Sequence, residues 1–356
     1  MGRFTNKTAS AVRIVRSCLS EGSGVFASPD RYKYQCWTRD LALAVAPLLH
    51  TMGESGIVRT HLENLTTQQR ENGQIPIVFL SDEVAWRTKK VAERGEQSFM
   101  VTRYDAGQLW NLTPGTKDSE ILYVIAMYEY AMATGDHDFI KRYADNIERA
   151  LAYVEHANLN TDGLTVGADW RDTMEVFLSE RALLTNNVLL TRAYRLAGKE
   201  VKAKRHQERI LSHFYQNGSV IDYLPDGERP DPLGAALAVL LGVASASDYP
   251  MMRDLFGEVD SPHGVTIKCI HNPYQDGEEE VFARTQGEVV WPFVVGFSAM
   301  ALKKMGFVQD ARAQFTKLKE LNGFFEWYDP ATGCGWGAKE QLWSATLYLR
   351  AQANLC

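Results

Sequence analysis

The chain has 356 residues, of which 45% are hydrophobic and 23% are charged, so it has the composition of a globular protein with room for one large domain or two small ones. A formal net charge of -6 argues against a nucleic-acid-binding protein, which would normally carry a basic patch. No run approaches the roughly 20 apolar residues that span a bilayer, and no signal-peptide core follows Met1, so we expect a cytoplasmic protein without membrane contact.

The five cysteines are scattered along the sequence and never form a CxxC pair. This arrangement indicates neither a disulfide framework nor a zinc site. The eight histidines show no convincing metal spacing either. We therefore expect reduced thiols, no metal and no other cofactor.

Apolar residues recur at positions i, i+3, i+4 and i+7 along most of the chain, whereas alternating strand patterns are scarce. This periodicity predicts an all-α fold. The expected helices cover about residues 4–21, 39–52, 54–71, 118–134, 136–158, 179–198, 199–217, 231–244, 248–257, 287–306, 308–321 and 339–354.

Every second expected helix is apolar on most of its faces, as in 41–49 and 234–243, which predicts a buried position. The helices between them carry a charged face and should lie outside. Long connections lead from outer to inner helices and short ones lead back. Six such hairpins closing on themselves would form an (α/α)6 toroid in a single domain, residues 1–356. The alternative is an open helical solenoid, against which stand the uneven periods and the absence of a repeat consensus.

The first long connection ends in an aromatic and charged segment at the expected mouth of a helix. It contains Tyr34, Trp37, Arg39 and Asp40. Helix capping alone would explain Asp40, but it would not explain the neighbouring Trp37 and Arg39. We expect these four side chains to bind a substrate.

The second long connection supplies four more candidate binding residues, namely Gln74, Asp105, Trp110 and Asp118. Asp118 stands directly before an expected helix, where an aspartate often accepts hydrogen bonds from the first turn. Its sequence position is equally compatible with capping the helix and with binding a substrate.

The third long connection sets two carboxylates and an arginine around a tryptophan, in the run Asp169, Trp170, Arg171 and Asp172. A partly buried, aromatic setting raises the pKa of a carboxyl group, as a general acid requires, whereas a nearby guanidinium favours ionisation. The structural alternative is that one aspartate caps a turn while the other pairs with Arg171.

The connection before residue 291 offers Gln286 and Glu288 as hydroxyl ligands and Trp291 as an aromatic wall. The last connection places Glu326 beside Trp327 and ahead of Gln341 and Trp343. Aromatic faces suit the apolar faces of a sugar ring, and polar groups between them suit its hydroxyls.

Glu326 is the first candidate for a catalytic base, and Asp169 or Asp172 is its natural partner. Inverting glycoside hydrolysis requires a protonated carboxyl group at the leaving oxygen and a carboxylate that activates water, about 6.5 to 9.5 Å apart. Two carboxylates on opposite loops of a toroid could satisfy that separation.

Together these motifs resemble the inverting (α/α)6-barrel glycosidases related to glucoamylase, the bacterial GH63-type glucosidases, neutral invertase and the amylo-α-1,6-glucosidase domain of glycogen-debranching enzyme. The resemblance implies that Arg39 and Asp40 hold a sugar in the −1 subsite, and that Asp118 matches the aspartate after the second long loop. It favours Asp172 over Asp169 as the general acid and assigns Glu326 as the general base. Glu288 departs from the family pattern, in which a small residue is common.

The sequence thus predicts an inverting, exo-acting hydrolase for an α-glucoside or a related small saccharide. A noncatalytic carbohydrate-binding or scaffold protein is one alternative. A sugar epimerase on the same barrel is another, although it would need histidines in the key loops, and none occurs there before residue 263. The oligomeric state is left open.

Overall fold

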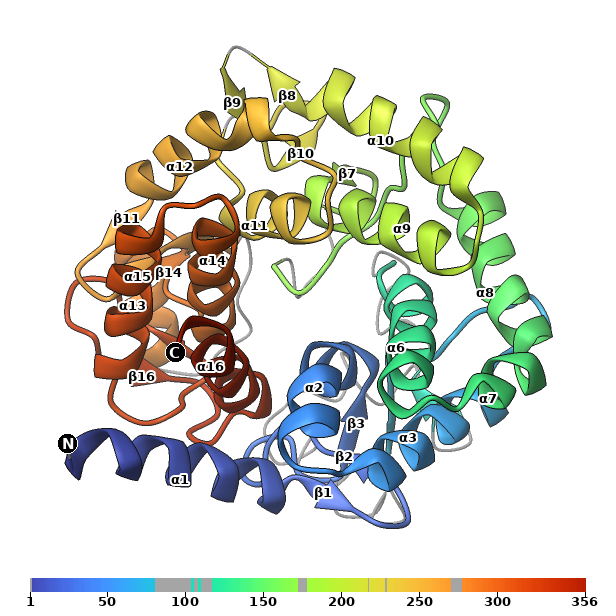
Figure 1. The fold of residues 1–356 in the computed structure, drawn as a ribbon, viewed down its shortest axis with the longest axis horizontal. Helices are drawn as coiled ribbons and strands as arrows, with labels where there is room; N and C mark the ends of the chain where they lie inside the picture. Colours follow the sequence, from blue (N-terminus) through green and yellow to red (C-terminus); the bar gives the residue numbers. More distant parts are fainter. Residues whose placement is uncertain are drawn as a thin grey trace.

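A computed structural model describes residues 2–80, 104–105, 108–109, 117–171, 178–216, 218–227, 229–269 and 277–356. The expected inner helices form a closed ring around a central axis (Figure 1). They are α2 (Thr38–Thr51), α6 (Ser119–Thr134), α9 (Leu184–Leu196), α11 (Pro232–Leu240), α14 (Pro292–Lys304) and α16 (Leu342–Leu355). Each packs on the next along the chain, and α16 packs back on α2, so the fold is the predicted (α/α)6 toroid rather than an open solenoid.

The outer helices surround this ring (Figure 1). They are α1 (Gly2–Ser17), α3 (Ser55–Thr67), α7 (His137–Arg142) with α8 (Ala144–Ala157), α10 (Glu200–Phe214), α12 (Tyr249–Glu258) and α15 (Val308–Glu320). In α8 the buried residues are Ile147, Ala150, Leu151 and Val154, which follow the i, i+3, i+4, i+7 spacing of a helix with one apolar face. By contrast, residues 292–302 of α14 are buried without interruption, as the inner position demands.

Two expected helices differ from the structure in a way that has a clear cause, and one helix was not expected. The helix expected at 136–158 is interrupted at Tyr143, whose ring packs 4.9 Å from that of Phe139. The helix expected from 287 begins at Pro292, because Glu288–Val289 instead pair as a strand with Ile267–Lys268. A short helix that was not expected, α13 (Gly277–Arg284), carries glutamates in its first turn, where negative charge is favourable.

Short antiparallel strands lie within the connections and do not change the helical architecture. They form two-stranded ribbons and one four-stranded sheet in the order β3-β4-β6-β5. Their bounds are β1 Leu19–Ser20, β2 Gly24–Val25, β3 Gln35–Trp37, β4 Val78–Leu80, β5 Tyr104–Asp105, β6 Gln108–Leu109, β7 Ala182–Leu183, β8 Tyr215–Gln216, β9 Ser219–Val220, β10 Tyr223–Leu224, β11 Asp260–Ser261, β12 Gly264–Val265, β13 Ile267–Lys268, β14 Glu288–Val289, β15 Trp327–Tyr328 and β16 Gly335–Trp336.

Backbone hydrogen bonds join one long connection to its neighbours around the ring. The N–H of Thr38 donates to Ile77 O at 3.0 Å, and that of Lys117 donates to Ala168 O at 3.2 Å. Val290 and Tyr328 exchange two bonds of 2.8 and 3.0 Å. The ring closes with Leu342 N–H on Ala27 O at 2.9 Å. These bonds gather the connections that lead into the inner helices at one end of the toroid.

None of the helices in the described ranges is both long and apolar enough to cross a membrane.

Candidate active site

Glu326 lies in the last long connection, immediately before β15, and its side chain is buried. The Tyr32 hydroxyl donates to both carboxylate oxygens, at 3.1 and 3.2 Å, and the Ala338 N–H donates to Oε2 at 2.9 Å. The Glu326 N–H in turn donates to Ala338 O at 2.8 Å. Burial raises the pKa of Glu326, while the Arg31 charge, the Ala338 N–H and the Tyr32 hydroxyl oppose that rise.

The position of the Glu326 carboxylate depends on a neighbouring glycine. Gly337 has a φ of +75°, and a Cβ atom added to it would lie 2.7 Å from the Glu326 Cβ and closer still to Oε2. An L side chain fits poorly at this φ and would also collide with the carboxylate. The chain therefore needs glycine at position 337 to let residues 326 and 338 pair.

Asp40, in the first turn of α2, is buried near Glu326. Its Oδ1 accepts a hydrogen bond of 3.2 Å from Gln341 Nε2. Burial raises the pKa of Asp40 to about 7; Arg39 opposes this shift and the Glu326 charge adds to it. Among the described residues, the buried Oε1 of Gln341 has no hydrogen-bond partner. Asp40 and Gln341 thus form a buried polar pair beside the candidate base.

Arg39 links this group to the second connection through an ion pair of 2.7 Å between its Nε and Asp118 Oδ2. Asp118 is the N-cap residue of α6, but its side chain makes no hydrogen bond to the first turn, so it caps the helix by position only. Burial opposes the charge of Arg39, but Asp118, Asp169 and Asp40 outweigh it and raise the Arg39 pKa. Carboxylates from three parts of the chain therefore act on one guanidinium, and Asp118 is the one in contact with it.

The third connection contributes a buried charge network. Arg171 donates from Nε to both oxygens of Asp169 at 3.1 Å, and its Nη1 lies 3.2 Å from Asp231 Oδ2. Asp169 is thus held in a buried ion pair with the Arg171 guanidinium. The sequence left open that one of the two aspartates of this connection pairs with Arg171, and Asp169 is the one that does so.

Two members of this network were missed by the sequence analysis. Asp231 accepts 2.9 Å from the Gly234 N–H and so caps α11; an aspartate directly before a proline at a helix start could have revealed it. Asp222 has a pKa raised to about 7 by burial, with Arg171 opposing and Asp231 adding to the shift. No local sequence pattern marks Asp222. Tyr32 was also missed, although it stands within the aromatic run before Trp37.

Four aromatic rings from three connections pack together beside the charged groups. Trp170 lies 4.7 Å from Trp291 and 5.0 Å from Phe293, and Trp343 lies 5.3 Å from Trp291 and 4.9 Å from Phe293. All four side chains are buried. Because Trp291 and Trp343 stand at the starts of α14 and α16, this cluster ties the inner helices together at the site.

Three other predicted aromatic residues lie outside this cluster. Trp327 is fully buried, and its ring stacks on that of Trp336 with the centroids 6.1 Å apart. It therefore packs as part of the hydrophobic core. Trp37 is half-buried and donates to Gln35 Oε1 at 3.1 Å. Tyr34 is half-buried with a φ of 68° and packs edge-on against Phe26.

The remaining predicted residues do not join the buried cluster or fall outside what is described. Gln286 and Glu288 are exposed, and Glu288 pairs with Arg229 at 2.8 Å. Gln74 is buried in the turn after Gly73. Trp110, Asp172 and the side chain of Asp105 lie outside the described residues. Within the described ranges, no group of three or more His, Cys, Asp or Glu side chains is arranged to hold a metal.

Solved structures share this fold over nearly the whole chain. A GH63 mannosylglycerate hydrolase from Thermus thermophilus, in complex with Tris and D-glycerate, is 16% identical with a TM-score of 0.69, covering 96% of this chain and 99% of that one. A wild-type glycosidase is 14% identical with a TM-score of 0.70, covering 99% and 97%. A rhamnosidase from Klebsiella oxytoca, with rhamnose bound, is 13% identical with a TM-score of 0.67, covering 98% of this chain but 63% of that one. No protein-family model and no curated protein sequence matches the chain.

Proposed function

We propose that this protein is an inverting, exo-acting glycoside hydrolase, built as one catalytic domain, with Glu326 as general base and Asp172 as general acid. The observation that carries the proposal is the buried Glu326 carboxylate, held by Tyr32 and Ala338 at the end of the toroid where polar and aromatic residues from several connections meet. The glycosidases that share the toroid support the same reaction class.

Glu326 has the properties that a general base requires. A carboxylate offers about four lone-pair positions. Tyr32 supplies a single proton that lies within reach of both oxygens, and Ala338 supplies one more to Oε2. Acceptor capacity therefore remains for a hydrogen bond from a water molecule. The raised pKa makes the ionised carboxylate a stronger proton acceptor than an exposed glutamate.

The reaction then needs two proton transfers. Asp172 donates a proton to the glycosidic oxygen as the bond from that oxygen to the anomeric carbon breaks. Water attacks the anomeric carbon from the opposite face, and Glu326 takes the proton that the water loses. The released sugar has the inverted anomeric configuration.

Arg39, Asp40, Asp118 and Gln341 are suited to bind the hydroxyls of the terminal sugar. The pairs Arg39–Asp118 and Asp40–Gln341 hold these polar groups in place before a sugar arrives. Within the described part of the chain, the buried Asp118 Oδ1 and Gln341 Oε1 have acceptor capacity left over. Since buried acceptors without partners are costly, sugar hydroxyls would stabilise both.

The test is a hydrolysis screen of mannosylglycerate, glucosylglycerate, α-glucosides, sucrose, trehalose and α-rhamnosides, followed by NMR of the anomer released first. We expect one class to be hydrolysed with inversion. Glu326→Gln should lower kcat by about 100-fold to 10,000-fold, the usual contribution of a general base, with the melting temperature little changed.

Lys339→Gln is a matched control, because Lys339 is a neighbouring polar residue of the same connection that we do not place in the site. Release of the retained anomer would refute the inverting mechanism. Full activity of Glu326→Gln would refute the assignment of the base. Saccharide binding without turnover of any substrate would support a noncatalytic carbohydrate-binding protein instead.

A further inference from the structure

A cavity lined by charged and apolar side chains opens at the end of the toroid opposite the candidate active site, where the inner helices finish. It has a volume of about 270 Å³ and lies between the C-terminal halves of α2, α6, α9 and α16. That volume corresponds to roughly nine water molecules at about 30 Å³ each. The residues of the candidate active site stand at the other ends of α2, α6 and α16, so the two sites are separate.

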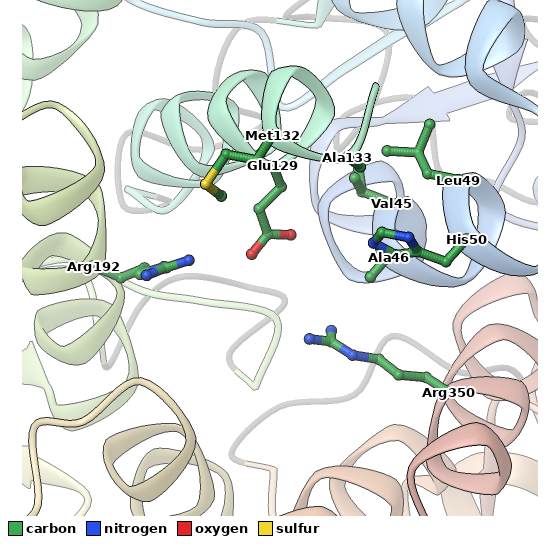
Figure 2. A pocket seen from close by; sticks show the side chains of 9 residues that line it. All are labelled: Val45, Ala46, Leu49, His50, Glu129, Met132, Ala133, Arg192 and Arg350. Atoms are coloured by element: carbon green, nitrogen blue, oxygen red, sulfur yellow. The ribbon is translucent and has the colours of Figure 1, made fainter. Parts of the chain in front are cut away.

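Three charged side chains from three helices point toward one another across this cavity (Figure 2). Glu129 comes from α6, Arg192 from α9 and Arg350 from α16. Leu49 and Met132 supply apolar wall beside them, and His50 lies at one side. The lining therefore combines a surplus of positive charge with an apolar surface.

Within the described part of the chain, neither guanidinium group forms an ion pair. No acidic side chain of the described ranges lies within 4.0 Å of Arg192 or Arg350, although Arg350, Arg192 and His50 all act on Glu129 electrostatically. The buried Arg192 Nε also has no hydrogen-bond partner within those ranges. Burial lowers the pKa of Arg350 despite the opposing Glu129 charge, as expected for a cation that lacks a close counter-ion.

The structural explanation of these arginines is only partly sufficient. Cations are favourable near helix C-termini, and the Arg350 side chain lies over the Phe297 ring at 5.6 Å. Those effects explain why positive charge is tolerated at this end. They do not explain why two guanidinium groups face a common cavity with hydrogen-bonding capacity left unused, because a buried donor without a partner is costly.

We infer that this cavity is a binding site for a small carboxylate with an apolar body, whose carboxylate bridges Arg192 and Arg350 while its apolar part contacts Leu49 and Met132. Guanidinium groups match carboxylates geometrically through paired hydrogen bonds. One negative charge balances the two arginines and Glu129. This inference does not depend on the proposed hydrolase activity.

The probe is isobutyrate, and its neutral isostere isobutyramide is the control for shape. Binding to the full chain is followed by ligand-observed NMR and by calorimetry at low ionic strength. We expect saturable binding of isobutyrate and at least tenfold weaker binding of isobutyramide. Arg192→Gln and Arg350→Met should each weaken isobutyrate binding by at least tenfold, the size expected for a lost charge-assisted hydrogen bond.

Two further variants separate a local effect from general ones. Arg253→Gln removes the same charge from an exposed ion pair with Asp310 on outer helices, and it should bind isobutyrate as the parent does. Glu129→Gln removes the negative charge of the cavity, so it should strengthen isobutyrate binding several-fold, an effect that misfolding cannot imitate.

The inference would be overturned if isobutyramide bound as well as isobutyrate, or if inorganic phosphate bound and isobutyrate did not. Unchanged binding in the two arginine variants, or weaker binding in Glu129→Gln, would overturn it too. Loss of isobutyrate binding in Glu326→Gln would place the carboxylate at the candidate active site instead.

Discussion

Replacing Gly337 with alanine tests whether the position of the Glu326 carboxylate depends on a bare backbone beside it. Gly337 has a φ of +75°, and an added Cβ would lie 2.7 Å from the Glu326 Cβ and 3.1 Å from its Cδ. The first separation is shorter than real Cβ contacts and the second is tighter than most of them, so one of the two residues must move. The Glu326 side chain is held on its other side by Tyr32, hence its displacement disturbs the whole arrangement.

Two costs can be separated by a matched control. An L residue in the left-handed region costs about 1–2 kcal/mol, and Gly135→Ala should incur the same cost because Gly135 also has a φ of +75° with nothing within 4 Å of an added Cβ. Both variants should therefore melt a few degrees lower than the parent. Only Gly337→Ala should also displace the carboxylate, and a shift of about 1 Å can reduce kcat by about 100-fold.

The assay compares kcat, KM and melting temperature of both variants on the substrate found in the hydrolysis screen. We expect both variants to melt lower than the parent, Gly337→Ala more so because of its close contact, and only Gly337→Ala to show a fall in kcat. Equal kcat values for the two variants would show that the close contact with Gly337 does not hold Glu326 in place. A loss of activity in Gly135→Ala of the same size would show that backbone strain alone is responsible.

The buried carboxyl groups lead to two predictions about pH dependence. The Tyr32 hydroxyl lowers the pKa of Glu326 against the effect of burial. Tyr32→Phe should therefore move the acidic limb of the kcat/KM profile to higher pH, and an acidic limb that stayed in place or moved to lower pH would contradict this. Burial raises the pKa of Asp222 from 3.8 to about 7, so its stabilising contribution is present below about pH 4 and is lost as pH rises through 7. Between about pH 4 and pH 7, the free energy of unfolding measured in urea should therefore fall more for the parent than for Asp222→Asn. A difference between the two proteins that stayed constant over this pH range would exclude the effect.

The helical framework could be predicted because each helix carries its own pattern. The spacing of Ile147, Ala150, Leu151 and Val154 is visible in the sequence and reappears as the buried face of α8. The start of α14 could not be predicted in the same way. Glu288–Val289 pair with β13, twenty residues earlier in the chain, and such a partner leaves no periodic signal.

The candidate site was predictable as a set of connections but not as a set of contacts. Asp118 occupies a capping position, and only the approach of Arg39 from another hairpin shows that its side chain is used elsewhere. The pairing of Glu288 with the distant Arg229 likewise could not be read from the segment around Glu288. Asp231, by contrast, lies at a recognisable helix start, but its ion pair with Arg171 forms only because the fold brings two distant segments together.

The backbone hydrogen bonds between neighbouring connections bear on how this protein can be engineered. A connection transplanted from another toroid would have to present matching donors and acceptors to the loops on either side, such as Thr38 to Ile77 or Val290 to Tyr328. Otherwise buried peptide groups would lack hydrogen-bond partners both in the recipient protein and in the transplanted connection. Changes of specificity by loop exchange should therefore succeed with adjacent pairs of connections, transferred together, more often than with single ones.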